Sequence, residues 1–169
     1  MPQQAVVVFA KDKSRVSAFY QRTLALDVHE SDASHDLLRG HGCEVVVHAI
    51  PPRYAADIAI ATPPAPRDDT PIKPTFVVAS LADVRRAAES TGGFLKPDAG
   101  AWQIRGHTVI DGWDPEGNVL QFRHRFVDAG EHELAVEVTR EGDPVPQNDR
   151  GQAVVRSIAA PRILCVTPN

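Results

Sequence analysis

Four side chains that could bind or react with a small molecule fall on predicted β-strands: His48, Lys73, Gln121 and Arg123. An imidazole can act as a general base, and a cation beside it can stabilise an oxyanion or an enolate. Gln121 and Arg123 share one face of their strand, because successive side chains of a strand point to opposite faces. His48 and Gln121 would orient a ligand, and Lys73 and Arg123 would suit one with an anionic or carbonyl group.

Aromatic side chains would complete such a site. Phe9 would line the hollow, and three further aromatic residues would form a stacking wall at its rim: Tyr54, Trp102 and Trp113. An apolar hollow with a few convergent polar groups is the usual form of a small-molecule site. A structural role is the alternative for each residue. Lys73 could pair with Glu44, Arg123 could lie at a sheet rim, and the aromatic residues could belong to the core.

The composition is that of an ordinary folded domain. The chain has 169 residues, of which 43% are hydrophobic, which suffices for a core in one domain or in two small modules. The net charge of -4 without a basic stripe argues against nucleic-acid and membrane partners. The two cysteines, Cys43 and Cys165, have neither a disulfide nor a metal-site spacing. The N-terminus lacks a signal-peptide pattern and no apolar run could span a bilayer, so we expect a cytoplasmic protein.

The first half of the chain predicts a strand, a helix and three strands. Residues 5–10 form a short run rich in β-branched residues, typical of a strand buried on both faces. Asp12 is a good N-cap for a helix over residues 13–24. The three further strands are predicted over residues 26–29, 35–39 and 43–50.

The second half repeats this order. Residues 73–79 predict a strand, and Ser80 caps a helix that runs from residue 81 to about residue 89, with Asp83 completing a capping box. Three strands are then predicted over residues 94–97, 102–113 and 119–125.

Superposing the two caps, Asp12 and Ser80, aligns the halves as an internal repeat. We therefore predict an α+β fold of two βαβββ modules, residues 4–50 and 73–125, joined by the proline-rich linker 51–72. Neither module could cover both faces of its sheet alone, so the two should pack side by side as one domain, residues 1–126, with sheets curled around a cup.

Residues 127–169 form a C-terminal extension of different character, in which residues 127–152 are charged and polar, with Pro144 and Pro146 in a loop-like run. Strands are predicted over residues 134–138, 153–155 and 163–166. This β-rich C-terminal extension is either a loosely attached tail or an arm that pairs with a sheet edge or a second subunit.

The repeat, with the caps and turns that bound its elements, resembles the vicinal oxygen chelate superfamily, which includes glyoxalase I, bleomycin-resistance proteins and extradiol dioxygenases. The most specific match is the turn Asp114-Pro115-Glu116-Gly117-Asn118, which is followed directly by an apolar strand. The other matching segments are Asp12 with Ala18-Phe19-Tyr20, residues 24–28, Phe76-Val77-Val78 with Leu81, Ala87-Ala88, and Gly92-Gly93. Ala25 departs from the pattern, because the family usually has glycine there. The resemblance implies a glyoxalase-like cup, usually in a homodimer.

In catalytic members of the superfamily, four side chains on four strands hold a divalent metal in the cup. The resemblance places these positions on Ala5, His48, Lys73 and Gln121. An alkyl group, an ammonium and an amide are poor ligands for a transition metal, and a lysine charge would repel it. We therefore expect no metal and no other cofactor.

Three functions remain open. The first is a metal-free, bleomycin-resistance-like protein that binds and sequesters an antibiotic or a metabolite. The second is a lyase or isomerase in which His48 is the general base and Lys73 and Arg123 stabilise an anion. A third possibility is a regulatory or assembly module formed by the C-terminal extension.

Overall fold

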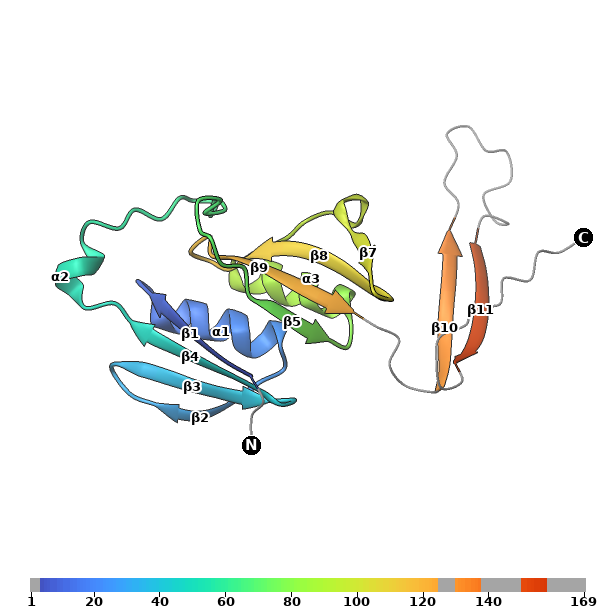
Figure 1. Ribbon diagram of the computed structural model, residues 1–169, viewed down its shortest axis with the longest axis horizontal. Helices are drawn as coiled ribbons and strands as arrows, with labels where there is room; N and C mark the ends of the chain where they lie inside the picture. Colours follow the sequence, from blue (N-terminus) through green and yellow to red (C-terminus); the bar gives the residue numbers. More distant parts are fainter. Residues whose placement is uncertain (1–3, 125–129, 138–149, 158–169) are drawn as a thin grey trace, which may run out of the picture. The chain divides into compact units, whose positions relative to one another are not determined.

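The computed structural model describes residues 4–124, 130–137 and 150–157 (Figure 1). The chain divides into two compact units, residues 1–125 and 126–169. In the second unit, β10 (Gly130–Glu137) pairs antiparallel with β11 (Arg150–Ser157). The third strand predicted for this region, over residues 163–166, lies outside the described residues. No helix in the described part of the chain is long and apolar enough to cross a membrane.

The first module has a four-stranded sheet in the order β1-β4-β3-β2. The strands are β1 (Gln4–Ala10), β2 (Asp27–Ser31), β3 (His35–Gly40) and β4 (Cys43–Ala49), and β1 pairs with β4 in parallel. Helix α1 (Lys13–Thr23) follows β1.

The second module has the same topology, with the strand order β5-β9-β8-β6 and β7 paired to β8. Its first strand is parallel to β9, as β1 is to β4. Its elements are β5 (Thr75–Val78), α3 (Leu81–Thr91), β6 (Phe94–Leu95), a 3₁₀ turn (Asp98–Gly100), β7 (Trp102–Ile104), β8 (His107–Trp113) and β9 (Val119–His124).

Both predicted helices and their caps are confirmed. The Asp12 side chain accepts a hydrogen bond from the Arg15 backbone N–H, and Ser80 Oγ accepts one from the Asp83 backbone N–H. Gly92 takes the left-handed conformation, φ 84°, at the C-terminal cap of α3.

Two strand predictions are wrong in detail. The strand predicted over residues 102–113 is a hairpin, β7 and β8, because Arg105 and Gly106 both take positive φ angles of 50° and 76° and reverse the chain. The strand β1 is buried on one face only, since Val8 and Ala10 are buried whereas Val7 and Phe9 are exposed.

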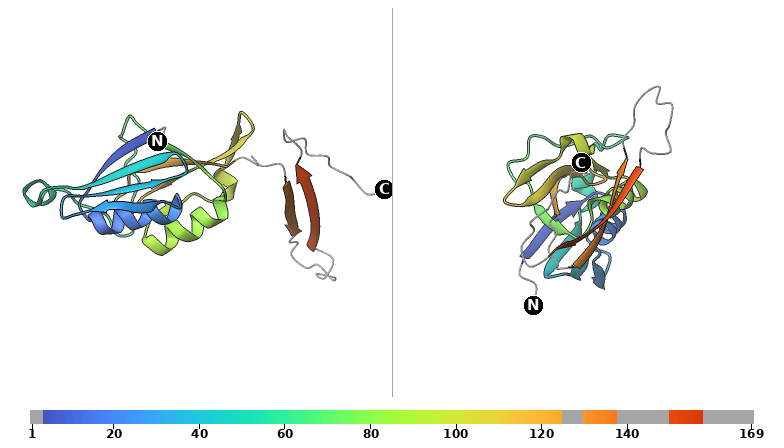
Figure 2. Two further views of the ribbon diagram at one scale, coloured as in Figure 1. Left: turned by 90° about the horizontal axis from the view of Figure 1, so that it is seen from below. Right: turned by 90° about the vertical axis from the view of Figure 1, so that its right-hand side faces the viewer.

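The two helices lie on the same side of the two sheets (Figure 2). The core fills the space between helices and sheets and contains Val8, Val16, Phe19, Tyr20, Leu38, Val45, Val47, Phe76, Val84, Ile110, Leu120 and Phe122. We call the opposite side of the sheets the open face. On it Val7, Phe9 and Val77 are 55%, 63% and 65% exposed, although they are large apolar residues.

The homodimer expected from the resemblance stays a prediction.

The linker contains the short helix α2 (Pro52–Ala55) and then runs along the second module. Trp113 Nε1 donates to the Pro64 carbonyl at 2.9 Å, and the Arg67 backbone N–H donates to the Gly117 carbonyl at 2.8 Å. A Cβ atom on Gly117 would lie 2.1 Å from the Ala65 carbonyl oxygen, so this turn needs glycine both for its φ of 84° and for the close approach of the linker.

The turn that begins at Asp114 joins the two modules. The buried Asp114 carboxylate accepts hydrogen bonds from the backbone N–H groups of Glu116 and Asn118, at 2.9 and 3.0 Å, and from Asn118 Nδ2 at 2.8 Å. Tyr20 of α1 reaches the same carboxylate with its hydroxyl at 3.5 Å. Burial raises the pKa of both groups, most strongly that of Tyr20.

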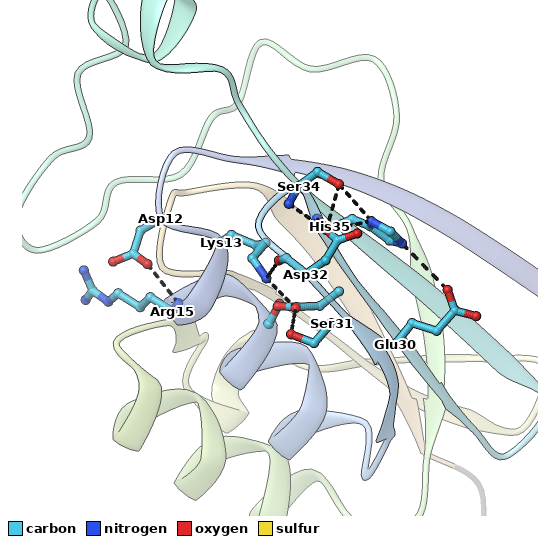
Figure 3. A network of polar contacts seen from close by, with 10 residues as sticks. Asp12, Lys13, Arg15, Glu30, Ser31, Asp32, Ser34 and His35 are labelled. Atoms are coloured by element: carbon cyan, nitrogen blue, oxygen red, sulfur yellow. Dashed lines mark hydrogen bonds and ion pairs between the residues drawn. The ribbon is translucent and has the colours of Figure 1, made fainter.

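A second buried carboxylate, Asp36, fastens α1 to β3. It accepts hydrogen bonds from Ser17 Oγ at 2.5 Å, from Ser31 Oγ at 2.6 Å and from the Lys13 ammonium. Figure 3 shows Lys13 and Ser31 beside the neighbouring loop, in which Asp32 Oδ1 accepts hydrogen bonds from the backbone N–H groups of Ser34 and His35. Burial raises the pKa of Asp36, but these hydrogen bonds outweigh burial and hold the pKa below its ordinary value.

Asp36→Asn is expected to reduce the loss of stability in acid. Because the pKa of Asp36 is lowered by folding, the ionised group stabilises the fold above the unfolded-state pKa of about 4, and this stabilisation disappears as the pH falls further. Urea unfolding from about pH 6 down to about pH 3 would measure it, with wild type losing more stability than the variant. Equal losses would contradict a role for the Asp36 network.

Candidate functional site

A charged cluster lies on the open face of the second module. Asp111 of β8 accepts hydrogen bonds from Lys73 Nζ at 2.9 and 3.0 Å, and Lys96 Nζ lies 3.7 Å from Asp111 Oδ2. The Asp111 side chain is only 12% exposed, whereas those of Lys73 and Lys96 are 39% and 48% exposed. One nearly buried carboxylate therefore holds two ammonium groups that a ligand can reach.

Gln121 lies in the same cross-strand row, because β9 places it opposite Thr75 of β5 and opposite Asp111 of β8. Its amide nitrogen donates to Asp111 Oδ1 at 3.4 Å, and its amide oxygen accepts from Thr75 Oγ1 at 3.3 Å and from Arg123 Nε at 3.4 Å. Because all three hydrogen bonds are longer than the usual 2.7–3.2 Å, a ligand could replace them at little cost.

Arg123 and Trp102 occupy the next row on the open face. Both lie opposite Val109, one on each side of β8. Arg123 contacts the neutral Gln121 amide, and no carboxylate in the described part of the chain pairs with it. The Trp102 ring is 39% exposed, and Lys73 Nζ lies 5.9 Å from its centroid.

His48 and Phe9 are together, but in the first module. The register places them opposite each other on β4 and β1, and the rings stack with centroids 5.6 Å apart. His35 of β3 stacks on the other side of His48 at 5.4 Å. Within the described residues, neither ring nitrogen of His48 has a hydrogen-bond partner, so the imidazole is held by stacking alone.

Tyr54, predicted for the rim, lies elsewhere. It is on α2, 57% exposed, with the Arg53 guanidinium carbon 4.6 Å from its ring centroid. Trp113 shares a face of β8 with Asp111, but its ring stacks on Phe94 with the centroids 4.4 Å apart and its N–H donates to the Pro64 carbonyl of the linker. Lys73, Gln121, Arg123 and Trp102 are therefore the predicted site residues that the fold brings into one cluster.

The open face does not fit a divalent metal. Thr75 opposes Gln121, and Val7 opposes Val46; because the two modules are offset by 68 residues, from Asp12 to Ser80, Val46 and not His48 is the counterpart of Gln121. With Val46 in place of His48, the four positions hold Ala5, Val46, Lys73 and Gln121, of which two are alkyl side chains. In the described part of the chain no group of three or more histidine, cysteine, aspartate or glutamate side chains could hold a metal ion.

Sequence reasoning missed Asp111 and Lys96. Asp111 stands in the apolar run Val109-Ile110-Asp111, and a carboxylate in such a buried strand needs a partner. That pattern could have identified Asp111. The partner could not be identified from local sequence, since Lys73 is 38 residues away along the chain.

No family model and no curated protein sequence matches the chain. Solved structures do match, at a TM-score of 0.51 in each of three cases. A glyoxalase/bleomycin resistance protein from Albidiferax ferrireducens T118 is 19% identical, and the match covers 72% of this chain and 97% of that chain. The bleomycin resistance determinant encoded on transposon Tn5 is 18% identical, covering 75% and 99%.

The third structure is a glyoxalase/bleomycin resistance protein/dioxygenase family enzyme from Burkholderia phytofirmans PsJN, 16% identical over 73% of this chain and 98% of that chain. Identities this low speak for the fold and not for a shared activity. The match agrees with the two βαβββ modules and with their curved, unclosed sheets. This chain has the glyoxalase/bleomycin-resistance fold, as the resemblance of its sequence predicted.

Proposed function

We propose that this protein binds a small organic anion with an apolar body on the open face of its second module, without a divalent metal. The observation that carries this proposal is the excess of positive charge around Asp111. Lys73, Lys96 and Arg123 contribute three cations and Asp111 one anion, so the cluster has two uncompensated positive charges.

The groups have the chemistry for this task. A guanidinium can bind a carboxylate or a phosphonate through two parallel N–H donors, and charge-assisted hydrogen bonds of this kind are about twice as strong as neutral ones. The ammonium of Lys73 is already fixed by Asp111, so little conformational entropy is lost when it meets a ligand. Gln121 would orient the ligand by exchanging its long internal hydrogen bonds for shorter ones.

Apolar side chains flank the cations and suit the body of such a ligand. Trp102, Ile104 and Val77 are 39%, 41% and 65% exposed. Each of the three would lose apolar surface to a ligand, worth about 25 cal/mol per Å² buried. An anion with a flat ring fits this combination better than a bare inorganic ion.

Four probes that share one ring test the proposal: benzoate, phenylphosphonate, neutral benzamide and cationic benzamidinium. We expect both anions to quench tryptophan fluorescence and to raise the thermal midpoint, with the same affinities in EDTA. A ligand at a hundred times its dissociation constant should stabilise the fold by about 2.7 kcal/mol. Preference for benzamidinium, or loss of anion binding in EDTA, would overturn the proposal.

Catalysis with His48 as general base is the second candidate. It is favoured by one observation, namely that both ring nitrogens of His48 are uncommitted within the described residues. The stacked rings of Phe9 and His35 fix the plane of the imidazole, but no partner fixes its tautomer, as a general base usually requires. Recovering a bound ligand unchanged after long incubation would speak for binding alone, and turnover that His48→Ala abolishes would speak for catalysis.

A further inference from the structure

The two ends of the boundary between the modules are built differently. Strand β1 is at one edge of the first sheet, and β5 is at one edge of the second. At the end of β1, the Glu116 carboxylate of the second module accepts hydrogen bonds from the backbone N–H groups of Lys11 and Asp12, at 3.0 and 2.6 Å. The turn from Asp114 to Asn118 is long enough for Glu116 to reach the first module. These two hydrogen bonds close the boundary at this end.

The corresponding turn of the first module is much shorter. Only His41 and Gly42 connect β3 to β4, with φ angles of 49° and 76°, as a two-residue hairpin of the primed type requires. Such a turn has no side chain in the place of Glu116. The boundary consequently stays open at the start of β1 and the end of β5.

A pocket of about 350 Å³ occupies this open end, and we call it the boundary pocket. Its apolar wall is formed by Leu24, Leu26 and Phe76, which are 8%, 3% and 5% exposed. Gln4, Cys43 and Val77 lie at its margin together with the turn of residues 40–42. None of the charged residues Lys73, Lys96, Asp111 and Arg123 lines it, although Val77, which lies opposite Arg123, does.

We propose that the boundary pocket is a second binding site of this protein, which takes an uncharged molecule of about one ring that carries both an apolar part and a polar group. The volume lies at the small end of the usual 300–1,000 Å³ range for ligand pockets. No lysine, arginine or carboxylate lines it, and its one histidine, His41, is an exposed residue of the turn, so an ionised ligand would lose hydration without gaining a fixed charged partner. The Gln4 amide and the Cys43 thiol supply polar contacts for one hydroxyl, carbonyl or ring N–H.

Cys43 allows a direct test in the full-length chain. The variant Cys165→Ser leaves Cys43 as the single thiol of the protein. Burial raises the pKa of the Cys43 thiol, so its alkylation by iodoacetamide is slow enough to follow. We expect indole and benzyl alcohol to slow the alkylation, by about tenfold when the probe exceeds its dissociation constant tenfold. Benzoate and benzamidinium, which carry the same ring with a charge, should give no protection.

A pair of substitutions at one exposed position supplies the control. Gln4→Trp should fill the pocket and abolish protection by indole, whereas Gln4→Thr removes one polar contact and leaves the pocket open, so protection should weaken but persist. Chemical shifts of the Gly42 and Leu26 amides in the unsubstituted chain should move on adding indole. Absence of both protection and shift changes up to about 1 mM indole, an affinity of only about 4 kcal/mol, would overturn the proposal.

Binding at the charged cluster and binding at the boundary pocket can succeed or fail separately. Anion binding without indole protection would refute only the second site. Indole protection without anion binding would refute only the proposed function of the cluster.

Discussion

Asp114→Ala is expected to lower the free energy of unfolding of the unit of residues 1–125 by about 3–6 kcal/mol. The substitution leaves three N–H donors of Glu116 and Asn118, one buried and two partly buried, without an acceptor, and a buried donor without a partner costs about 1–3 kcal/mol. It also removes the partner of the Tyr20 hydroxyl. Because the stability of a domain is commonly about 5–15 kcal/mol, a loss of this size would remove a large part of it.

Two milder substitutions make the result interpretable. Asp114→Asn keeps one carbonyl oxygen for the two backbone N–H groups and should cost clearly less. Tyr20→Phe removes only the long hydrogen bond of 3.5 Å and should cost about 1 kcal/mol or less. Urea unfolding followed by tryptophan fluorescence measures all three, since both tryptophans, Trp102 and Trp113, lie in this unit. A cost for Asp114→Ala no greater than that for Tyr20→Phe would show that the turn does not join the modules.

The order of the helices and strands was predictable because it depends on interactions between residues that are close in the sequence. Asp12 and Ser80 are side-chain caps that act within three residues, and Gly92 satisfies a backbone angle. The alternation along Val119–His124 correctly placed Gln121 on one face and Phe122 on the other. Each of these signals lies within a few residues of the structure it determines.

The composition of the site was less predictable, because it depends on register. A shift of two residues along β4 exchanges His48 for Val46 as the counterpart of Gln121, and nothing in an alternating strand distinguishes the two positions. The convergence of Lys73 and Lys96 on Asp111 joins three segments of the second module. The boundary pocket results from the different lengths of the turns β3–β4 and β8–β9. Its position could not be predicted without the arrangement of the two modules in space.

On the open face, a fixed positive charge occupies one of the positions that the resemblance assigns to a metal ligand. Lys73 takes that position, and its ammonium lies 2.9 and 3.0 Å from the two Asp111 oxygens. Unlike a metal ion, an ammonium needs no preformed set of ligands, and it can donate three hydrogen bonds.

Lys73→Met is accordingly expected to weaken the binding of benzoate and of phenylphosphonate by about ten- to a hundredfold. A hydrogen bond to a charged group contributes about 1.5–3 kcal/mol, and the substitution also leaves Asp111 with only the more distant Lys96. Repulsion between the less compensated Asp111 carboxylate and the ligand would add to the loss. Titration by tryptophan fluorescence measures the change.

Two variants serve as controls. Lys73→Arg keeps the charge and should retain most of the affinity for benzoate. Arg86→Met removes an exposed cation that pairs with Asp83 on α3, away from the site, and should leave the affinity unchanged. A role for the lysine in packing alone predicts the opposite pattern, in which methionine, a side chain of similar length, preserves binding and arginine impairs it.

The double variant Lys73→Met/Asp111→Asn separates the two parts of the effect. If the ammonium acts both by binding the ligand and by neutralising Asp111, removing the carboxylate should restore part of the affinity lost in Lys73→Met. In a double-mutant cycle, this restoration appears as an interaction energy between residues in contact, of about 0.5–3 kcal/mol. Additive losses would mean that Asp111 positions Lys73 without opposing the ligand. If neither substitution changes the affinity, the anion binds elsewhere on the protein.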